Sequence, residues 1–282
     1  FKRGTNRHSK GDKTRSVDEI VKVLFAVSEC IPFVKSGGLA DVAGSLPNQL
    51  KNLGIDVRVI MPKYGTIPDE FRQQMKKITE HTVQVGWRNQ YCGIEELHLD
   101  EVHYYFIDNE YYFKREKLYG FYDDGERFAY FCRAVIDSLP YLDFYPDVIH
   151  CHDWHTAMIS FLLKVQYKNR GEYQNIRSVL TIHNLKFQGI MPRETVGDLF
   201  GLSDEHINMN ELEYYGNVNL LKGGIVSADK ITTVSSTYRE EIQVEYYGEG
   251  LDGLLRKRKN DLIGILNVID DDFYNPEKDN FI

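Results

Sequence analysis

The chain has 282 residues, of which 42% are hydrophobic and 13% aromatic, so it has enough apolar side chains for a folded core and is not a disordered chain. Its formal charge of −8 argues against a nucleic-acid-binding protein, which normally presents a basic surface over much of a domain. No apolar run comes near the roughly 18 residues that a membrane helix needs, and residues 1–20 lack the apolar core of a secretory signal. We therefore expect neither a nucleic acid nor a membrane among the partners of this chain.

Charge is unevenly distributed, because residues 1–15 hold six lysines and arginines against one aspartate. This segment has no apolar periodicity and begins with Phe1, so we expect residues 1–19 to be a basic flexible tail or a remnant of cloning, on a chain that is itself a fragment. The cysteines lie far apart, which favours reduced, buried thiols in a cytosolic compartment: Cys30, Cys92, Cys132 and Cys151.

The first predicted elements form a βαβ unit. Residues 21–27 are a short apolar run with several β-branched side chains, typical of a buried strand. Apolar residues then recur every three or four positions over residues 39–53, which predicts an amphipathic helix with a kink at Pro47 and an end at Gly54. Residues 55–61 return to strand character.

The rest of the chain continues this theme after one interruption. Residues 76–107 alternate between polar and apolar side chains, which predicts an antiparallel hairpin inserted into the α/β core. Later strands are predicted at 147–151, 178–183, 230–234 and 262–266, and helices at 156–167, at 220–228 and from 236 onward. The pattern predicts one α/β domain with a largely parallel sheet flanked by helices.

Ligands of such sheets bind at the carboxyl ends of the strands, where polar residues of this chain gather at 28–38, 150–155 and 183–184. In the first of these, the segment Lys35-Ser36-Gly37-Gly38-Leu39-Ala40-Asp41 places two glycines between a strand and a helix. Glycine permits positive φ and lets backbone N–H groups approach a phosphate, which the helix N-terminus and a lysine also attract. It is neither a P-loop nor a G-x-G-x-x-G motif, and a tight turn with a solvated lysine is the alternative.

The second gathering is His150-Cys151-His152-Asp153-Trp154-His155. A metal site is disfavoured because no distant cysteine or histidine set completes it at a familiar spacing. Asp153 or Thr156 could cap the following helix, or Asp153 could hydrogen-bond sugar hydroxyls. The aromatic residues crowded at 104–145 are assigned mainly to core packing, and residues 123–126 to a turn and helix entry rather than a catalytic carboxylate pair.

Seven segments closely resemble bacterial glycogen synthases and the related plant starch synthases: VKSGGLADVAGSLP (34–47), VRVIMPKYG (57–65), YGFYDDGERFAYF (119–131), PDVIHCHDWHTAM (146–158), TIHNLKFQG (181–189), NLLKGGIVSADKITTVSSTYREEI (219–242) and GILNVIDDDFYNP (264–276). The resemblance implies that residues 20–267 are the Rossmann-like N-terminal lobe of a GT-B glycosyltransferase and that residues 268–282 begin the linker between lobes. It implies transfer of glucose from ADP-glucose, rather than UDP-glucose, to the non-reducing end of an α-1,4-glucan such as glycogen or a maltooligosaccharide.

The resemblance also implies a role for individual residues. The catalytic residues would be Lys35, Asp153 and His183. The donor would be bound by Lys35, Gly37, Gly38, Asp41 and Asn219. The glucose or the acceptor would be bound by Tyr119, Trp154 and Asn184. No metal and no cofactor are expected, and the reaction would retain the anomeric configuration by front-face attack of the acceptor 4-hydroxyl.

Two departures from the family pattern carry further expectations. Val268 stands where the family's hinge entry has glycine, so the turn there is expected to differ. The chain stops at Ile282, before the second lobe with its phosphate-binding arginine and lysine, so the 282-residue fragment is expected to be inactive or nearly so. The alternatives are a different GT-B transferase, a non-catalytic glucan-binding lobe and, more remotely, a nicotinamide-dependent oxidoreductase. A bacterial cytoplasm is the expected location, or a plastid for a plant protein.

Overall fold

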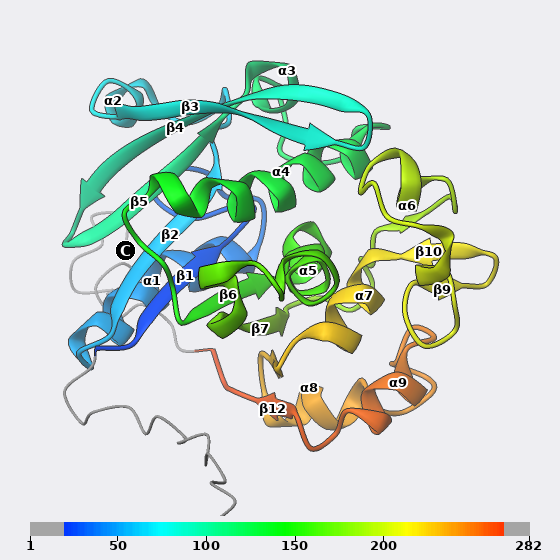
Figure 1. Cartoon of the computed structure of the whole chain (residues 1–282). Helices are drawn as coiled ribbons and strands as arrows, with labels where there is room; N and C mark the ends of the chain where they lie inside the picture. Colours follow the sequence, from blue (N-terminus) through cyan, green and yellow to red (C-terminus); the bar gives the residue numbers. More distant parts are fainter. Residues whose placement is uncertain (1–19, 268–282) are drawn as a thin grey trace, which may run out of the picture.

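The computed structural model describes residues 20–267, so Val268 and the expected linker lie outside the described residues. One nine-stranded sheet, in the order β12-β11-β7-β6-β1-β2-β5-β4-β3, runs through this part of the chain (Figure 1). Its strands are β1 (Lys22–Ala26), β2 (Asp56–Pro62), β3 (Lys76–Val85), β4 (Arg88–Leu99), β5 (Val102–Asp108), β6 (Val148–His152), β7 (Arg177–Ile182), β11 (Lys230–Thr233) and β12 (Leu262–Gly264). The strands from β12 to β5 are parallel, and β4 is antiparallel to both β5 and β3.

Helices cover both faces of this sheet (Figure 1). The chain moves from β1 towards β2 in one direction and from β6 towards β7 in the other, and right-handed crossovers then place α1 on one face and α5 on the opposite face. Helix α5 packs between α4 and α7. The helices are α1 (Gly38–Asn52), α2 (Asp69–Arg72), α3 (Glu110–Phe113), α4 (Asp124–Ser138), α5 (Asp153–Leu162, followed by a π-helical turn Leu163–Tyr167), α6 (Thr195–Asp198), α7 (Leu220–Ser227), α8 (Ser236–Glu241) and α9 (Asp252–Lys257). Within the described residues, no helix combines the length and the apolar character needed to cross a bilayer.

The predicted fold class is confirmed, with two corrections. The hairpin at 76–107 is present, but it is no separate insertion, because β5 pairs in parallel with β2 and carries β4 and β3 as an extension of the same sheet. A small second sheet, in the order β8-β10-β9, was not predicted: β8 (Ile190–Met191), β10 (Asn217–Asn219) and β9 (Glu213–Tyr214). Strands of two or three residues are too short to show a period in the sequence.

The core is continuous and built largely from the strands predicted to be buried. Leu24, Phe25 and Ala26 of β1 have no exposed surface. The assignment of most aromatic residues at 104–145 to packing is confirmed for Tyr104, Tyr105, Phe106, Tyr112 and Phe113, all of which are buried. The cysteines are also confirmed as free and buried.

Candidate active site

Strand β1 lies at the point of the sheet where the order of the strands changes direction. Ligand-binding sites of α/β proteins are found at such points, so we expect the site at the carboxyl end of β1. The chain leaves β1 towards β2 and later returns to β6 on the other side of β1. Loops leaving the carboxyl ends of β1 and β6 therefore diverge and leave a crevice in which α/β proteins bind ligands. The loop after β1 carries Lys35, the end of β6 leads into Asp153, and the end of β7 leads into His183.

The loop after β1 is held from beneath by Glu29. One carboxylate oxygen of this buried side chain accepts hydrogen bonds from the backbone N–H groups of Ser36 (2.5 Å) and Gly37 (3.3 Å). Burial raises the pKa of Glu29 despite these bonds, and the nearby Asp41 raises it further. The amides of Ser36 and Gly37 are thus engaged by the protein, so the N–H groups at the start of α1, on Gly38 and Leu39, are the ones positioned for an anion.

The two loop glycines leave the backbone open to a ligand, and they are not needed to relieve backbone strain. Gly37 has φ −150°, an extended conformation that any residue adopts. A Cβ atom on Gly38 would meet nothing within 4 Å among the described residues. Positive φ, which glycine permits, is therefore not used at Gly37, and close approach of a ligand to the backbone is the reason for glycine that fits this loop.

Lys35 lies beside α1 and forms an ion pair with Asp41, with 2.6 Å between Nζ and Oδ1. Their side chains are 44% and 30% exposed, so both remain accessible to a ligand. The two predicted donor-binding charges therefore contact each other in this lobe. A diphosphate binding at the start of α1 would compete with Asp41 for the lysine.

Asp153 joins the ends of β6 and β7. Its Oδ1 accepts hydrogen bonds from the N–H groups of His183 (2.8 Å) and Asn184 (3.3 Å), so the predicted meeting of these strand ends is confirmed. Asp153 has φ +54°, a left-handed conformation that is uncommon outside glycine and asparagine and is often found at functional sites. Burial raises the pKa of Asp153 to about 7, against the two N–H bonds that favour the carboxylate.

The helix cap expected from Asp153 or Thr156 is not formed, because the residue before α5 is His152 and it makes no side-chain cap hydrogen bond. Thr156 lies within the first turns of the helix, where its hydroxyl accepts from the backbone N–H of His152 at 2.6 Å, and the Asp153 carboxylate accepts from the loop after β7. Helix α5 begins at Asp153, three residues before the predicted start.

Two of the histidines of this region are paired with each other, and a third is paired with a threonine of β7. His152 Nδ1 lies 3.0 Å from His183 Nε2, and His150 Nε2 lies 2.6 Å from the hydroxyl of Thr181. Burial lowers the pKa of His183 to about 4, so its imidazole is neutral at pH 7. Because one ring nitrogen of His183 is held by His152, the ring is fixed in orientation, and the other nitrogen is left for a ligand.

Trp154 is buried against aromatic side chains, with its ring 5.3 Å from that of Phe128 and 4.3 Å from that of His155. Gly189, at the end of the loop that starts with His183, approaches it closely. A Cβ on Gly189 would lie 2.5 Å from the indole, and the residue has φ +61°. Trp154 therefore supports the pocket from within and presents little surface to it.

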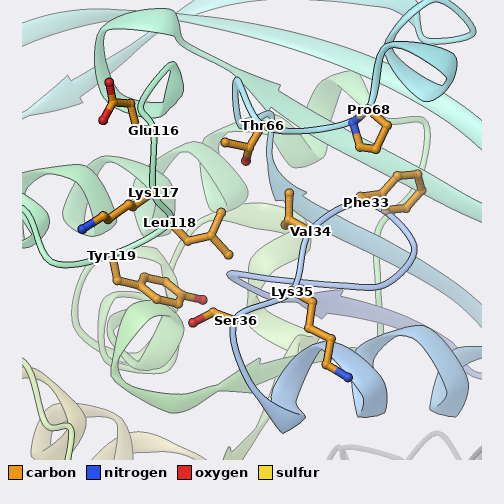
Figure 2. A pocket seen from close by; sticks show the side chains of 10 residues that line it. All are labelled: Phe33, Val34, Lys35, Ser36, Thr66, Pro68, Glu116, Lys117, Leu118 and Tyr119. Carbon is orange, nitrogen blue, oxygen red and sulfur yellow. The ribbon is translucent and has the colours of Figure 1, made fainter.

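Tyr119 approaches the site from another part of the chain. Its hydroxyl donates to the hydroxyl of Ser28 at 2.7 Å, and burial raises the pKa of the phenol well above its usual value. Tyr119, Lys35 and Ser36 border a cavity of about 540 Å³ between the loop after β1 and residues 116–119 (Figure 2). Asp153 and His183 are not among the residues lining this cavity, which lies beside the loop after β1.

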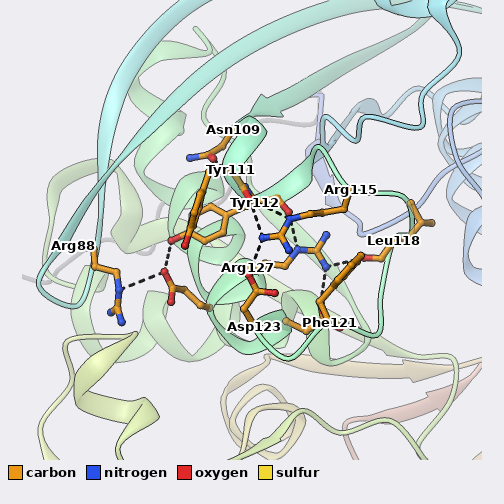
Figure 3. Close-up of polar contacts among 11 residues, drawn as sticks. Arg88, Asn109, Tyr111, Tyr112, Arg115, Leu118, Phe121, Asp123 and Arg127 are labelled. Carbon is orange, nitrogen blue, oxygen red and sulfur yellow. Dashed lines mark hydrogen bonds and ion pairs between the residues drawn. The ribbon is translucent and has the colours of Figure 1, made fainter.

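A buried arginine anchors the segment that carries Tyr119 (Figure 3). Arg127 has no exposed surface, and its guanidinium donates to the carbonyl oxygens of Tyr112 (2.7 Å) and Leu118 (3.0 Å) and to Asp124 (2.6 Å). Asp124 in turn accepts from the N–H of Gly120 at 2.7 Å. The assignment of residues 123–126 to a helix entry is thus confirmed, since α4 begins at Asp124 and its carboxylates hold the loop.

Two predicted ligand-binding residues have their side chains engaged within the protein. Asn219 is fully buried, where it caps α7 by accepting from the N–H of Lys222 (2.8 Å) and donates to Gln188 (2.5 Å). Asn184 is exposed, and its side-chain oxygen accepts from the N–H of Lys186 (3.0 Å). Asn219 therefore supports the crevice from below, and direct donor contact by it stays a prediction.

Several residues near the crevice were not singled out from the sequence. Ser28 and Glu29 lie two and three residues after the end of β1, so their strand-end position was a usable sign. Arg127 was not singled out, because its neighbours Glu126 and Phe128 give no local sign that its guanidinium is buried. His152 is one of three histidines in six residues, and the sequence does not indicate which of them contacts His183.

Comparison with known proteins places these features in context. A family described as "Starch synthase catalytic domain" matches residues 22–257. A glycogen synthase of Anoxybacillus flavithermus is 64% identical over 262 residues, and one of Geobacillus stearothermophilus is 63% identical over the same length; these matches cover 93% of this chain and 54% of each relative. The catalytic domain of starch synthase IV from Arabidopsis thaliana, solved with ADP and acarbose, has a TM-score of 0.85 and 31% identity, over 93% of this chain and 54% of that one. The chain thus spans about half the length of the relatives it matches.

Proposed function

Because this chain belongs to the family of glycogen and starch synthases, we propose that it supplies the N-terminal lobe of a retaining glucosyltransferase that transfers glucose from ADP-glucose to the non-reducing end of an α-1,4-glucan. The observation that carries the proposal is that the neighbouring parallel strands β1, β6 and β7 send three loops from the same edge of the sheet. The first loop leads to the N-terminus of α1 at Gly38, and the other two are joined by the hydrogen bond from the N–H of His183 to Asp153. ADP in the Arabidopsis neighbour supports an adenine nucleotide as donor. The bacterial relatives support a bacterial cytoplasm as the location.

In this proposal the donor diphosphate lies at the start of α1. The N–H groups of Gly38 and Leu39 and the ammonium of Lys35 stabilise its negative charge, which grows as the glycosidic oxygen leaves C1. The hydrogen bonds from Ser36 and Gly37 to Glu29 keep the loop in shape before the donor arrives. Little conformational entropy is then lost in this loop on binding.

The glucose lies beside Asp153 and His183 in the same proposal. The bond from C1 to the diphosphate oxygen breaks, a bond to the acceptor 4-hydroxyl oxygen forms on the same face, and the hydroxyl proton passes to the departing phosphate oxygen. Asp153, when ionised, stabilises positive charge on the sugar, and the neutral imidazole of His183 contributes a hydrogen bond without adding positive charge. No metal ion takes part.

Titration of ADP into the 282-residue chain by calorimetry tests the donor half of the proposal. Lys35→Ala should weaken ADP binding at least about tenfold, equivalent to roughly 1.4 kcal/mol, because it removes the charge nearest the diphosphate. Lys76→Ala is the matched control, since Lys76 is an exposed lysine on β3 at the far edge of the sheet. Equal loss of affinity in both variants, or no ADP binding by the parent chain, contradicts the proposal.

Incorporation of glucose from ADP-glucose into maltooligosaccharides tests the chemistry. We expect little or no turnover by the 282-residue chain and strong turnover once a second lobe from a relative is fused to it. In the fusion, His183→Ala should abolish turnover while glucan affinity is unchanged. Loss of glucan affinity with the same substitution favours a glucan-binding lobe instead.

A further inference from the structure

The hairpin formed by β4 and β5 carries a cluster of side chains that the proposed transferase reaction does not use. His98 and His103 are directly opposite each other in the antiparallel register, and Glu96 lies two residues before His98 on the same face of β4. Their ligand atoms all lie within 4.8 Å of one another. We propose that Glu96, His98 and His103 form a binding site for a divalent cation of the zinc class.

The spacing of these atoms suits a shared ion. His103 Nε2 and Glu96 Oε2 are 2.9 Å apart, and the rings of His98 and His103 have centroids 3.9 Å apart. Zinc binds imidazole nitrogen and carboxylate oxygen at about 2.0–2.2 Å, so two adjacent ligands of one ion lie roughly 3 Å apart. The nitrogen–oxygen pair already has that separation, and His98 needs only a side-chain adjustment to complete a three-ligand face.

The hairpin fixes the relative positions of the cluster residues and leaves the cluster accessible from solvent. Only Asp100 and Glu101 connect the two strands, both with positive φ, so the register that places His98 opposite His103 is fixed by a two-residue turn. His98 is exposed, while Glu96 and His103 are half-buried. An ion can therefore enter from solvent, and water can fill the remaining coordination positions, as at zinc sites with three protein ligands.

The charges around the cluster are mixed. Arg58 is in register with His103 on β2, and its positive charge opposes a cation, but its guanidinium lies 3.7 Å from Asp56 and 4.1 Å from the ring centroid of Phe144. Lys51 donates to the backbone carbonyl of Glu101 at the turn. Asp100 and Glu101 at the turn, with Glu96 itself, add negative charge to this end of the hairpin.

The ligand set decides the class of ion. Two imidazoles and one carboxylate suit Zn²⁺, Co²⁺, Ni²⁺ or Cu²⁺, whereas Mg²⁺ and Ca²⁺ prefer oxygen ligands alone. The cluster lies on β4 and β5, separated by β2 and β1 from the strands that lead to Asp153 and His183 (Figure 1). The bound ion would therefore join the two strands of the hairpin and take no part in glucosyl transfer.

Calorimetric titration of Zn²⁺ into chelator-treated 282-residue chain tests the site, with Co²⁺ absorption as a spectroscopic signature of coordination. We expect His98→Gln and His103→Gln each to weaken Zn²⁺ binding at least tenfold and to abolish the Co²⁺ band. His206→Gln is the matched control, because His206 also lies 2.9 Å from a carboxylate, that of Glu211, but belongs to no three-ligand group among residues 20–267.

His98 is exposed, so His98→Gln keeps the fold, which far-UV circular dichroism verifies. The proposal is overturned if the parent chain binds no Zn²⁺, if His98→Gln leaves the affinity unchanged, or if His206→Gln weakens it as much as His98→Gln does.

Discussion

Replacing Gly189 by alanine perturbs the contact between the loop after β7 and Trp154. Gly189 has φ +61°, and a Cβ there would lie 2.5 Å from Cε3 and 2.9 Å from Cδ2 of the indole. Gly216 offers a matched control, because it has φ +82° and its Cβ would meet nothing within 4 Å. The two substitutions therefore share the backbone cost and differ in the clash.

The size of each effect follows from these two terms. A residue other than glycine in the left-handed region costs roughly 1–2 kcal/mol. Carbon atoms pack at about 3.5–4.0 Å, so the indole must move by about 1 Å, and such overpacking costs roughly 1–3 kcal/mol. Trp154 cannot move freely, since Phe128 and His155 pack against it. We expect Gly189→Ala to destabilise the chain by about 2–5 kcal/mol and Gly216→Ala by about 1–2 kcal/mol.

Urea denaturation followed by far-UV circular dichroism measures both free energies of unfolding. Tryptophan fluorescence of the folded state provides a second readout, because only Gly189→Ala should shift the emission of Trp154. Equal unfolding midpoints for the two variants, with unchanged emission, would refute the close approach of Gly189 to the indole.

Four further substitutions test the site. Asp153→Asn should remove most of the decrease in the free energy of unfolding between about pH 4 and pH 7 in urea titrations. The folded pKa of Asp153 is about 7 and lies above the usual 3.8, so the protonated carboxyl stabilises the fold at low pH and this contribution, on the order of 4 kcal/mol, is lost as pH rises. His183→Gln should reduce the acid sensitivity of the same midpoint between pH 6.5 and pH 4, because the folded pKa of about 4 lies below 6.5 and the histidine's contribution is lost as pH falls. Arg127→Met should lower the free energy of unfolding by about 3–5 kcal/mol in the same assay, since it removes the ion-pair partner of Asp124 and the donors to the carbonyl oxygens of Tyr112 and Leu118; a loss below about 1 kcal/mol would contradict this. Gly38→Ala should leave the thermal midpoint unchanged or raised, because its Cβ meets nothing, yet weaken ADP binding in calorimetry.

Most of the large sheet could be predicted because buried parallel strands are short apolar runs with turn residues at their ends. Such runs mark β1, β2 and β7 in the sequence. The start of α5 was predicted three residues late, since the φ of +54° at Asp153 depends on its bonds to β7, which is remote in sequence. The connection of β5 to β2 is likewise a tertiary pairing that alternation along the chain does not indicate.

The candidate site also has some features that the sequence predicts and others that depend on tertiary contacts. The rule that polar residues meet at strand ends predicted the contact between Asp153 and His183. It could not predict that Glu29 turns beneath its own loop, because the direction of a side chain in a loop depends on the packed structure. Asn219 had a usable local sign, since asparagine before an apolar helical stretch is a common N-cap, and the structure places it in that position.

The central position of β1 has a consequence for synthesis of the chain. Lys22, which begins β1, and Asp147, which precedes β6, are 125 residues apart, and they form a hydrogen bond at the seam between the two strands. At about 5–20 residues per second, a ribosome needs roughly 6–25 s to make that stretch. During that interval β1 to β5 have emerged, and the apolar β1 has an unpaired flank that can pair with other nascent chains. Strand β1, which lies in the middle of the finished sheet, is thus an exposed edge strand until β6 has been made.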